Sequence, residues 1–293
     1  MRRPTLTLLT TALTTAGLLA LATPATAAHG ALVVTGLTAN DRLVTFAASD
    51  PARIRSEVRI TGLAPGDDVE AIDFRPATGG LYALVTSRAG GARLFLVDPV
   101  TGVATRVGDT TLPISGNISI DVNPAVDRLR VVSDDGTNLR LNLDTGALAA
   151  TDGRLTYAPG DAAAGAAPGI GDVAYTNNDV LPGTGTALYD VDATRDQLAL
   201  QADPNAGVLT SVGPLGQRTK AQATGFDVYT RTTDGTNWAF VSLFDKGRTT
   251  FYEIDLATGQ PITVTTPVPG SGQQIGTRPH VTDIALAPGQ TGF

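Results

Sequence analysis

The stretch "AIDFRPATGGLYALVTSRAGGARLFLVDPVTG", residues 71–102, indicates the fold class of the whole chain. Two runs rich in apolar residues, 81–85 and 93–97, are followed by a turn that starts at Asp98 and ends at Gly102. The runs have the period of two that is typical of strands. An Asp that leaves a strand and a Gly that enters the next one are typical of a short hairpin loop. The stretch therefore predicts antiparallel strands joined by tight turns.

Both ends of this stretch recur along the chain. Its closing turn returns as "LNLDTG" at 141–146, "ADPNAG" at 202–207 and "IDLATG" at 254–259, and the first turn positions are 44, 61 and 52 residues apart. Its opening returns as "SIDVNP" at 119–124, "VAYTNN" at 173–178, "GFDVYT" at 225–230 and "DIALAP" at 283–288. Units of about 50 residues with four short strands each are the sequence mark of a β-propeller.

The two ends of the repeat region complement each other. Complete units are expected to begin near residues 69, 118, 173 and 226, which leaves 31–63 at one end and 281–287 at the other. The first remainder has three expected strands and lacks an innermost one, while the last is a single strand of the innermost type. We therefore predict an all-β propeller of five four-stranded blades, closed by the C-terminal strand joining the N-terminal blade. Residues 28–293 would form this single domain.

Residues 1–27 have the pattern of a secretory signal. Arg2 and Arg3 precede an apolar segment over 6–22, and Ala25-Thr26-Ala27 has the form of a cleavage site. The sequence therefore predicts cleavage after Ala27 and a secreted, extracellular protein with no membrane anchor.

Charge and cysteine content limit the partners. The chain has 21 basic and 28 acidic residues, and loss of the signal with its two arginines changes the net charge from −7 to −9. Nucleic acid and anionic membranes both require a basic surface, so neither is an expected partner. Cysteine is absent, which excludes disulfides, thiolate metal sites and a cysteine nucleophile. The expected partner is a small molecule, a glycan or a protein, and we expect a monomer.

Four segments together resemble one known family. They are "LTANDRLVTFAASDP" at 37–51, "IDFRPATGGLYAL" at 72–84, "DVNPAVDRLRVVSDDGTNLRLNLDTG" at 121–146 and "LALQADPNAGVLTSVGPLG" at 198–216. The chain resembles the secreted bacterial family catalogued as domain of unknown function 4394 over nearly all of residues 31–288. The resemblance implies a propeller-like exported protein and no established activity.

Aspartates on the expected innermost strands are the candidate functional centre. Asp73, Asp121 and Asp227 hold one equivalent position on three of these strands, and Ala174 and Ala285 hold it on the other two. Three carboxylates converging on a central channel could form a glycosidase-like centre or a cation site. Alternatively, each aspartate is buried and accepts hydrogen bonds within its own blade, as buried polar groups must.

The absence of common catalytic motifs limits the possible functions. The sequence contains no G-x-S-x-G, no HExxH, no phosphate-binding glycine loop and no EF-hand spacing. A non-catalytic binding or scaffold propeller is the first hypothesis. A carboxylate-based carbohydrate-active hydrolase and a calcium-dependent hydrolase, each acting at the channel mouth, are the alternatives. Whether the protein is an enzyme is left open, and calcium is the one cofactor that the carboxylates suggest.

A set of polar residues, called here the polar ladder, interrupts the apolar strands. Its members are Arg75, Asn123, Arg128, Arg130, Asn138 and Arg140. The alternation of Arg128, Arg130, Asn138 and Arg140 with Leu and Val predicts a network between blades, in which each guanidinium requires a carboxylate partner. In the other interpretation these residues, with Arg75 and Asn123 near the channel mouth, bind an anionic or sugar ligand.

Overall fold

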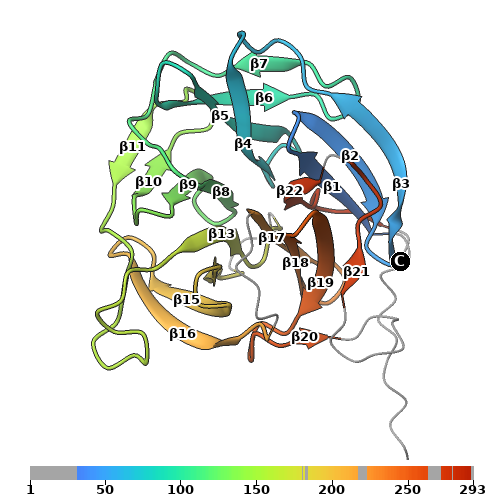
Figure 1. The fold of residues 1–293 in the computed structure, drawn as a ribbon. Coiled ribbons are helices and arrows are strands. Elements are labelled where there is room, and N and C mark those ends of the chain that lie inside the picture. The colour runs from blue at the N-terminus through green and yellow to red at the C-terminus, as the bar shows by residue number, and fades with distance from the viewer. Residues whose placement is uncertain are drawn as a thin grey trace, which may run out of the picture.

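Five β-sheets surround a common axis in the computed structural model (Figure 1). The structure describes residues 32–179, 181, 184–216, 223–262, 272–278 and 280–291. Every regular element within these ranges is a strand. None of the described residues belongs to a helix long and apolar enough to cross a membrane. The all-β propeller prediction is confirmed, whereas the expected signal sequence and its cleavage site lie outside the described residues.

The sheets are numbered here as blades I to V, each given from its innermost strand outward. Blade I contains β22 (Val281–Ala285), β1 (Val33–Thr38), β2 (Arg42–Ala47) and β3 (Asp50–Arg59). Blade II contains β4 (Asp67–Phe74), β5 (Leu81–Ser87), β6 (Ala92–Val97) and β7 (Ala104–Arg106). Blade III contains β8 (Ile118–Asn123), β9 (Arg128–Ser133), β10 (Asn138–Leu141) and β11 (Leu148–Thr151).

Blades IV and V each add a fifth short strand. Blade IV contains β13 (Ile170–Tyr175), β14 (Leu188–Asp192), β15 (Gln197–Asp203), β16 (Val208–Pro214) and β12 (Thr156–Tyr157), which runs parallel to β16. Blade V contains β17 (Ala223–Thr230), β18 (Asn237–Asp245), β19 (Arg248–Ile254) and β20 (Pro261–Ile262), with β21 (Gln273–Gln274) on β19.

The C-terminal strand closes the ring, as the sequence predicted. β22 pairs antiparallel with β1, with Gly36 opposite Ile284 and Leu37 opposite Asp283. Blade I is thereby built from both ends of the described chain, and its innermost strand arrives last.

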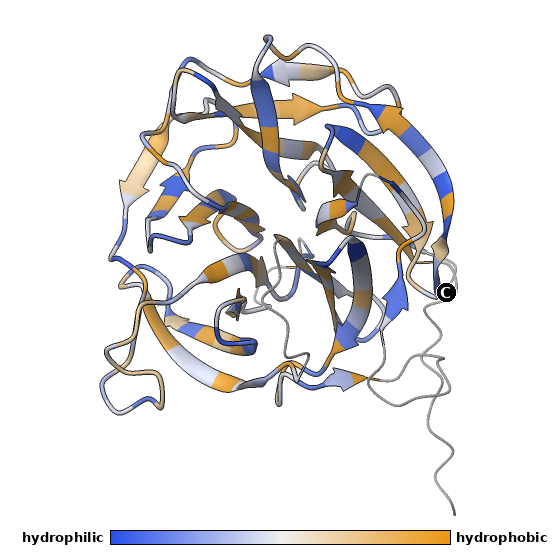
Figure 2. Cartoon of the chain, in the orientation of Figure 1, coloured by the Kyte–Doolittle hydropathy of each residue, from blue (hydrophilic) through white to orange (hydrophobic). Residues whose placement is uncertain are grey.

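The hydrophobic core is divided among the spaces between blades. Tyr82 and Leu84 of blade II, for example, pack with Ile118 and Ile120 of blade III. Along an outer strand such as β3, hydrophilic and hydrophobic residues alternate, as expected for a strand with one covered face (Figure 2). Each blade is therefore stabilised by the faces of its neighbours.

Two features of the structure require glycine at the last position of the repeated turn. Gly102 has a φ of 73°, in the left-handed region that favours glycine. A Cβ atom there would also lie only 2.1 Å from the carbonyl oxygen of Arg59 in the preceding blade. Equivalent close approaches, at 2.2–2.6 Å, occur at Gly146, Gly207 and Gly259. The repeated turn thus determines both the hairpin and the distance between blades.

Candidate functional site

Each innermost strand carries one buried aspartate. These five, called here the axial ring, are at most 6% exposed and comprise Asp73, Asp121, Asp172, Asp227 and Asp283. The sequence pattern predicted three of them, and it indicated alanine at the equivalent position of the other two strands. The two that were missed, Asp172 in "GDVAY" and Asp283 in "TDIAL", are each followed by an apolar residue, as the other three are. They stand two residues before the position that the aspartate occupies in the other units. Because side chains alternate with period two, a shift of two residues keeps the side chain on the same face.

Each aspartate of the axial ring joins its own blade to the next. Asp73 accepts hydrogen bonds from the backbone N–H of Phe74 at 2.6 Å and from that of Val122, in blade III, at 2.7 Å. The same contact to the following blade joins Asp121 to Tyr175, Asp172 to Phe226, Asp227 to Leu286 and Asp283 to Ile72. The contacts run round the whole propeller, so these carboxylates act between blades as well as within them.

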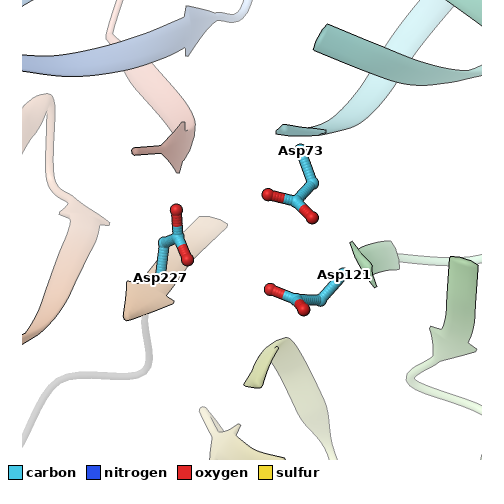
Figure 3. Close-up of side chains that lie close together, drawn as sticks. All are labelled: Asp73, Asp121 and Asp227. Atoms are coloured by element: carbon cyan, nitrogen blue, oxygen red, sulfur yellow. The ribbon is translucent and has the colours of Figure 1, made fainter. Parts of the chain in front are cut away.

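Three carboxylates of the axial ring converge, and they are called here the axial trio. Asp73, Asp121 and Asp227 point toward one another from β4, β8 and β17 (Figure 3). One oxygen of each lies within 4.8 Å of the others. The remaining pair, Asp172 and Asp283, share a side-chain hydrogen bond.

Burial and mutual repulsion change the acidity of the axial ring. Burial, with repulsion from neighbouring aspartates, raises the pKa of Asp73 and of Asp121 well above the ordinary value. Burial also raises the pKa of Asp227 to about 7 and that of Asp283 to about 6. Neutral pH therefore leaves part of the ring protonated.

A cavity of about 370 Å³ opens at the end of the channel where the innermost strands begin. Its wall includes the carboxylates of Asp68, Glu70 and Asp134, while the described residues that line it include no basic or aromatic side chain. Burial raises the pKa of Glu70, and burial followed by repulsion from Asp41 raises that of Asp68. This space, called here the mouth cavity, is acidic.

One buried hydroxyl group in the wall of the mouth cavity has no partner among the described residues. Thr224 is 7% exposed, and its Oγ1 makes no hydrogen bond within the part of the chain that the structure describes. A Cβ atom at Gly171, which also lines the cavity, would lie 2.8 Å from that oxygen. Glycine on β13 therefore packs directly against this buried hydroxyl, and a side chain at that position would have to displace it.

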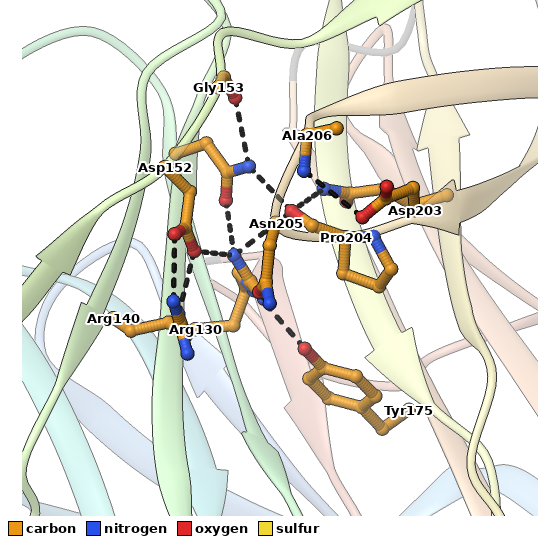
Figure 4. A network of polar contacts seen from close by, with 11 residues as sticks. Arg130, Arg140, Asp152, Gly153, Tyr175, Asp203, Pro204, Asn205 and Ala206 are labelled. Atoms are coloured by element: carbon orange, nitrogen blue, oxygen red, sulfur yellow. Dashed lines mark hydrogen bonds and ion pairs between the residues drawn. The ribbon is translucent and has the colours of Figure 1, made fainter.

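Arg130 is the centre of the polar ladder (Figure 4). Its side chain is 2% exposed and donates to Asp152 at 2.6 Å, Asn138 at 2.7 Å and the Tyr175 hydroxyl at 3.1 Å. It also reaches the β15–β16 turn of blade IV, where Asn205 Oδ1 lies 3.2 Å away. The arginine therefore connects blades III and IV.

Arg140 shares the carboxylate of Asp152 but is less buried. It donates from Nε at 2.7 Å and from Nη2 at 2.9 Å, and 29% of its side chain is exposed. Asn138, beside it, donates to the carbonyl oxygens of Gly153 and Pro204.

The other ladder residues lie at the opposite end of the channel from the mouth cavity. Arg75 follows the last residue of β4 and pairs with Asp127 and Asp144, both in blade III. Asn123 accepts hydrogen bonds from its own turn, at Ala125 and Val126. A last contact runs from Arg128 to the carbonyl oxygen of Asp127. None of the six ladder residues is among the described residues that line the mouth cavity, and ligand binding by the ladder stays a prediction.

The sequence matches the family model described as Domain of unknown function (DUF4394) over residues 42–284. This match confirms the resemblance inferred from the repeated segments. No curated protein matches the chain in sequence.

Several solved structures are similar in backbone. An auxiliary nutrient binding protein from Bacteroides ovatus ATCC 8483 is 12% identical, with a TM-score of 0.40, over 70% of this chain and 55% of that one. A protein of unknown function from Bacteroides thetaiotaomicron VPI-5482 is 15% identical, with a TM-score of 0.50, over 87% of this chain and 65% of that one. A Bifidobacterium bifidum s17 protein provisionally assigned as an exo-beta-1,3-galactanase is 12% identical, with a TM-score of 0.50, over 86% and 90%.

The chain spans 55% and 65% of the length of the first two structures. At 12–15% identity the similarity shows the fold alone, and the likeness with a TM-score of 0.40 supports no argument about this chain.

Proposed function

This chain belongs to the family described as domain of unknown function DUF4394, and we propose that it is a non-catalytic binding propeller whose mouth cavity holds a small cationic ligand. The observation that carries the proposal is the lining of this cavity, which includes three carboxylates and, among its described residues, no basic side chain. The unpartnered hydroxyl of Thr224 is buried beside it. A volume of about 370 Å³ is in the ordinary range of small-molecule sites.

Charge supports a cation over an anion or a neutral sugar. Asp68, Glu70 and Asp134 line the cavity, and no basic side chain among its described lining residues offsets them. A like-charged, partly enclosed cleft raises the local concentration of ions of opposite sign. Sugar sites commonly use aromatic faces, and the described lining includes none. Ile118 and Ile170 in the wall would contact the carbon atoms of an organic cation.

The burial and the hydrogen bonds of the axial trio support a binding function without catalysis. Asp73 and Asp227 each use both carboxylate oxygens to accept backbone hydrogen bonds, and both residues are nearly fully buried. A glycosidase needs one carboxylate that donates a proton and another that reaches the sugar or a water beside it. Carboxylates held between blades in this way are poorly placed for that work.

A carboxylate hydrolase at the mouth cavity is the second candidate, and one observation favours it. Glu70 lines the cavity, is half-buried and has a raised pKa, as a general acid requires. The test is release of reducing sugar from plant and bacterial polysaccharides, galactans included, by wild type and by Glu70→Gln. Turnover that Glu70→Gln abolishes would replace the binding proposal.

The binding proposal is tested by calorimetric titration with tetramethylammonium and spermidine as cationic probes and galactose as the neutral one. We expect a cationic probe to bind, and its Kd to rise about tenfold or more in Glu70→Gln and Asp134→Asn. Asp109→Asn is the control, because Asp109 is exposed and is not among the described residues lining the cavity. Equal Kd values in all four proteins, or binding of galactose alone, would contradict the proposal.

Thr224→Val separates ligand binding from folding. Valine keeps the shape of threonine and removes a hydroxyl that has no partner within the described chain, so the variant should be at least as stable as wild type. We expect it nevertheless to bind the cationic probe more weakly. A variant that loses stability and keeps its affinity would show that the hydroxyl serves the fold.

A further inference from the structure

We infer that the axial trio binds a hard divalent cation, calcium by its size, at the centre of the propeller. The trio consists of Asp73, Asp121 and Asp227, from blades II, III and V. This site lies deeper in the channel than the mouth cavity, and the inference does not depend on the function proposed for that cavity.

The spacing of the carboxylates suits a shared ion. One oxygen from each lies within 4.8 Å of the other two. Calcium binds oxygen at about 2.3–2.6 Å, so an ion among these three oxygens can contact all of them. Each carboxylate oxygen has two acceptor positions, so a single hydrogen bond from a backbone N–H still leaves one position for a cation. The contacts between blades and an ion are therefore compatible.

A buried oxygen on the same strand face as Asp121 has no partner among the described residues. Ser119 is 3% exposed, and its Oγ makes no hydrogen bond among the residues that the structure describes. It lies two residues before Asp121 on β8, so strand alternation directs its side chain to the same face as that carboxylate. A buried hydroxyl without a partner costs free energy, and an ion bound to the trio would supply one.

The negative charge of the axial trio also favours a bound cation. The charged neighbours that most affect Asp73 and Asp121 are other aspartates. Three carboxylates at this spacing either keep protons or hold a positive ion, because several like charges are strongly unfavourable in a buried site. A divalent ion would neutralise two of the three charges while leaving each backbone contact in place.

The experiment measures bound metal and thermal stability in the same samples. Full-length protein is treated with EGTA and dialysed against calcium or magnesium, then analysed by elemental mass spectrometry and scanning calorimetry. We expect one calcium per chain. Calcium at about 100 times its Kd should raise the Tm by roughly 5–10 °C relative to the EGTA sample.

Four variants locate the ion. Asp121→Asn should lose the bound calcium and the rise in Tm, and Ser119→Ala, a milder change, should weaken retention several-fold in case the first variant fails to fold. Asp283→Asn is the matched control, because Asp283 makes the same backbone contact to the next blade but lies outside the trio. Glu70→Gln, in the mouth cavity, should bind calcium as wild type does.

Three outcomes would overturn the inference. The first is wild type that neither retains calcium nor changes its Tm with calcium or magnesium. The second is an equal rise in Tm in wild type, Asp121→Asn and Ser119→Ala, which would place the ion elsewhere. The third is loss of the effect in Glu70→Gln alone, which would assign the metal to the mouth cavity.

Discussion

The carboxylate of Asp227 accepts a hydrogen bond from the backbone N–H of Leu286 at 2.5 Å, which joins blade V to the segment just after β22. The same contact joins Asp73 to Val122 between two blades that are adjacent in sequence. Blades V and I, which meet near the C-terminal end of the described chain, are thus joined by the same type of contact as blades that are consecutive in sequence. β22 then contributes its own link, because Asp283 accepts from the N–H of Ile72 in blade II.

Deleting residues 281–293 should therefore destabilise the protein by several kcal/mol. The deletion removes the innermost strand of blade I, its pairing with β1 and the buried side chains of Val281 and Ile284. Deleting only 291–293 is the control, because it keeps β22 and Gln290, whose side chain bonds Val33. The measurement is the Tm of both truncations, and a longer truncation that melts within a degree or two of full length would show that the ring closes in another way.

Asparagine at any position of the axial trio should destabilise the fold by about 1–3 kcal/mol. Both carboxylate oxygens of Asp73 and of Asp227 accept a backbone N–H, so an amide group places donors at one of them and that hydrogen bond is lost. At Asp121 the contact to the Tyr175 N–H survives only if the amide oxygen faces it. Urea unfolding in EGTA measures the change, with Asp109→Asn as the exposed control. Stabilised variants at two or more of these positions would mean that relief of repulsion is larger than the loss of the backbone contacts.

Removal of Arg130 should cost more than removal of Arg140. Arg130→Ala removes the donor to Asn205 Oδ1 and one of the hydrogen bonds to the Tyr175 hydroxyl, and it opens the space between blades III and IV, a change of about 3–5 kcal/mol. Arg140→Ala leaves Asp152 with its second partner, Arg130, so we expect about 1–2 kcal/mol. Thermal and urea unfolding of both variants give the comparison. Equal losses would show that Arg140 is needed to hold Asp152 in place.

Stability in EGTA should fall as the pH rises from about 4 to about 7. Asp227 has an ordinary pKa of 3.8 in the unfolded chain and a pKa raised to about 7 in the fold, and Asp283 is raised to about 6. Between these values the folded state binds more protons than the unfolded state, so the free energy of unfolding decreases with pH. For Asp227 alone the loss is on the order of 4 kcal/mol.

Urea unfolding at pH 5, 6, 7 and 8 measures this slope. Carboxylates with a lowered pKa, such as Asp135 at about 2, change stability in the opposite direction, but only below about pH 4. The two windows therefore do not overlap. A free energy of unfolding that rises between pH 5 and pH 8 would show that the axial ring is ionised in the fold.

The sequence predicted the repeat architecture because its signals are local. An Asp–x–x–x–Gly turn and an alternating strand are properties of a few consecutive residues, and their recurrence yields the blades and the closing strand. It also placed Asp73, Asp121 and Asp227 on innermost strands. It missed Asp172 and Asp283 because the apolar residues of their units align with the other units only when each aspartate stands two residues earlier. A shift of two residues keeps a side chain on the same strand face, so the alternating pattern gives no sign of it.

What the sequence by itself determined is the set of blades and the side of each strand on which its aspartate lies. Only the tertiary structure decided what each aspartate contacts, because the acceptor of Val122 is Asp73, 49 residues earlier and in another blade. The same holds for the mouth cavity, where Glu70, Asp134 and Thr224 come from three blades. No local pattern encodes such a set, since its members meet only when the ring closes and brings the starts of the innermost strands together.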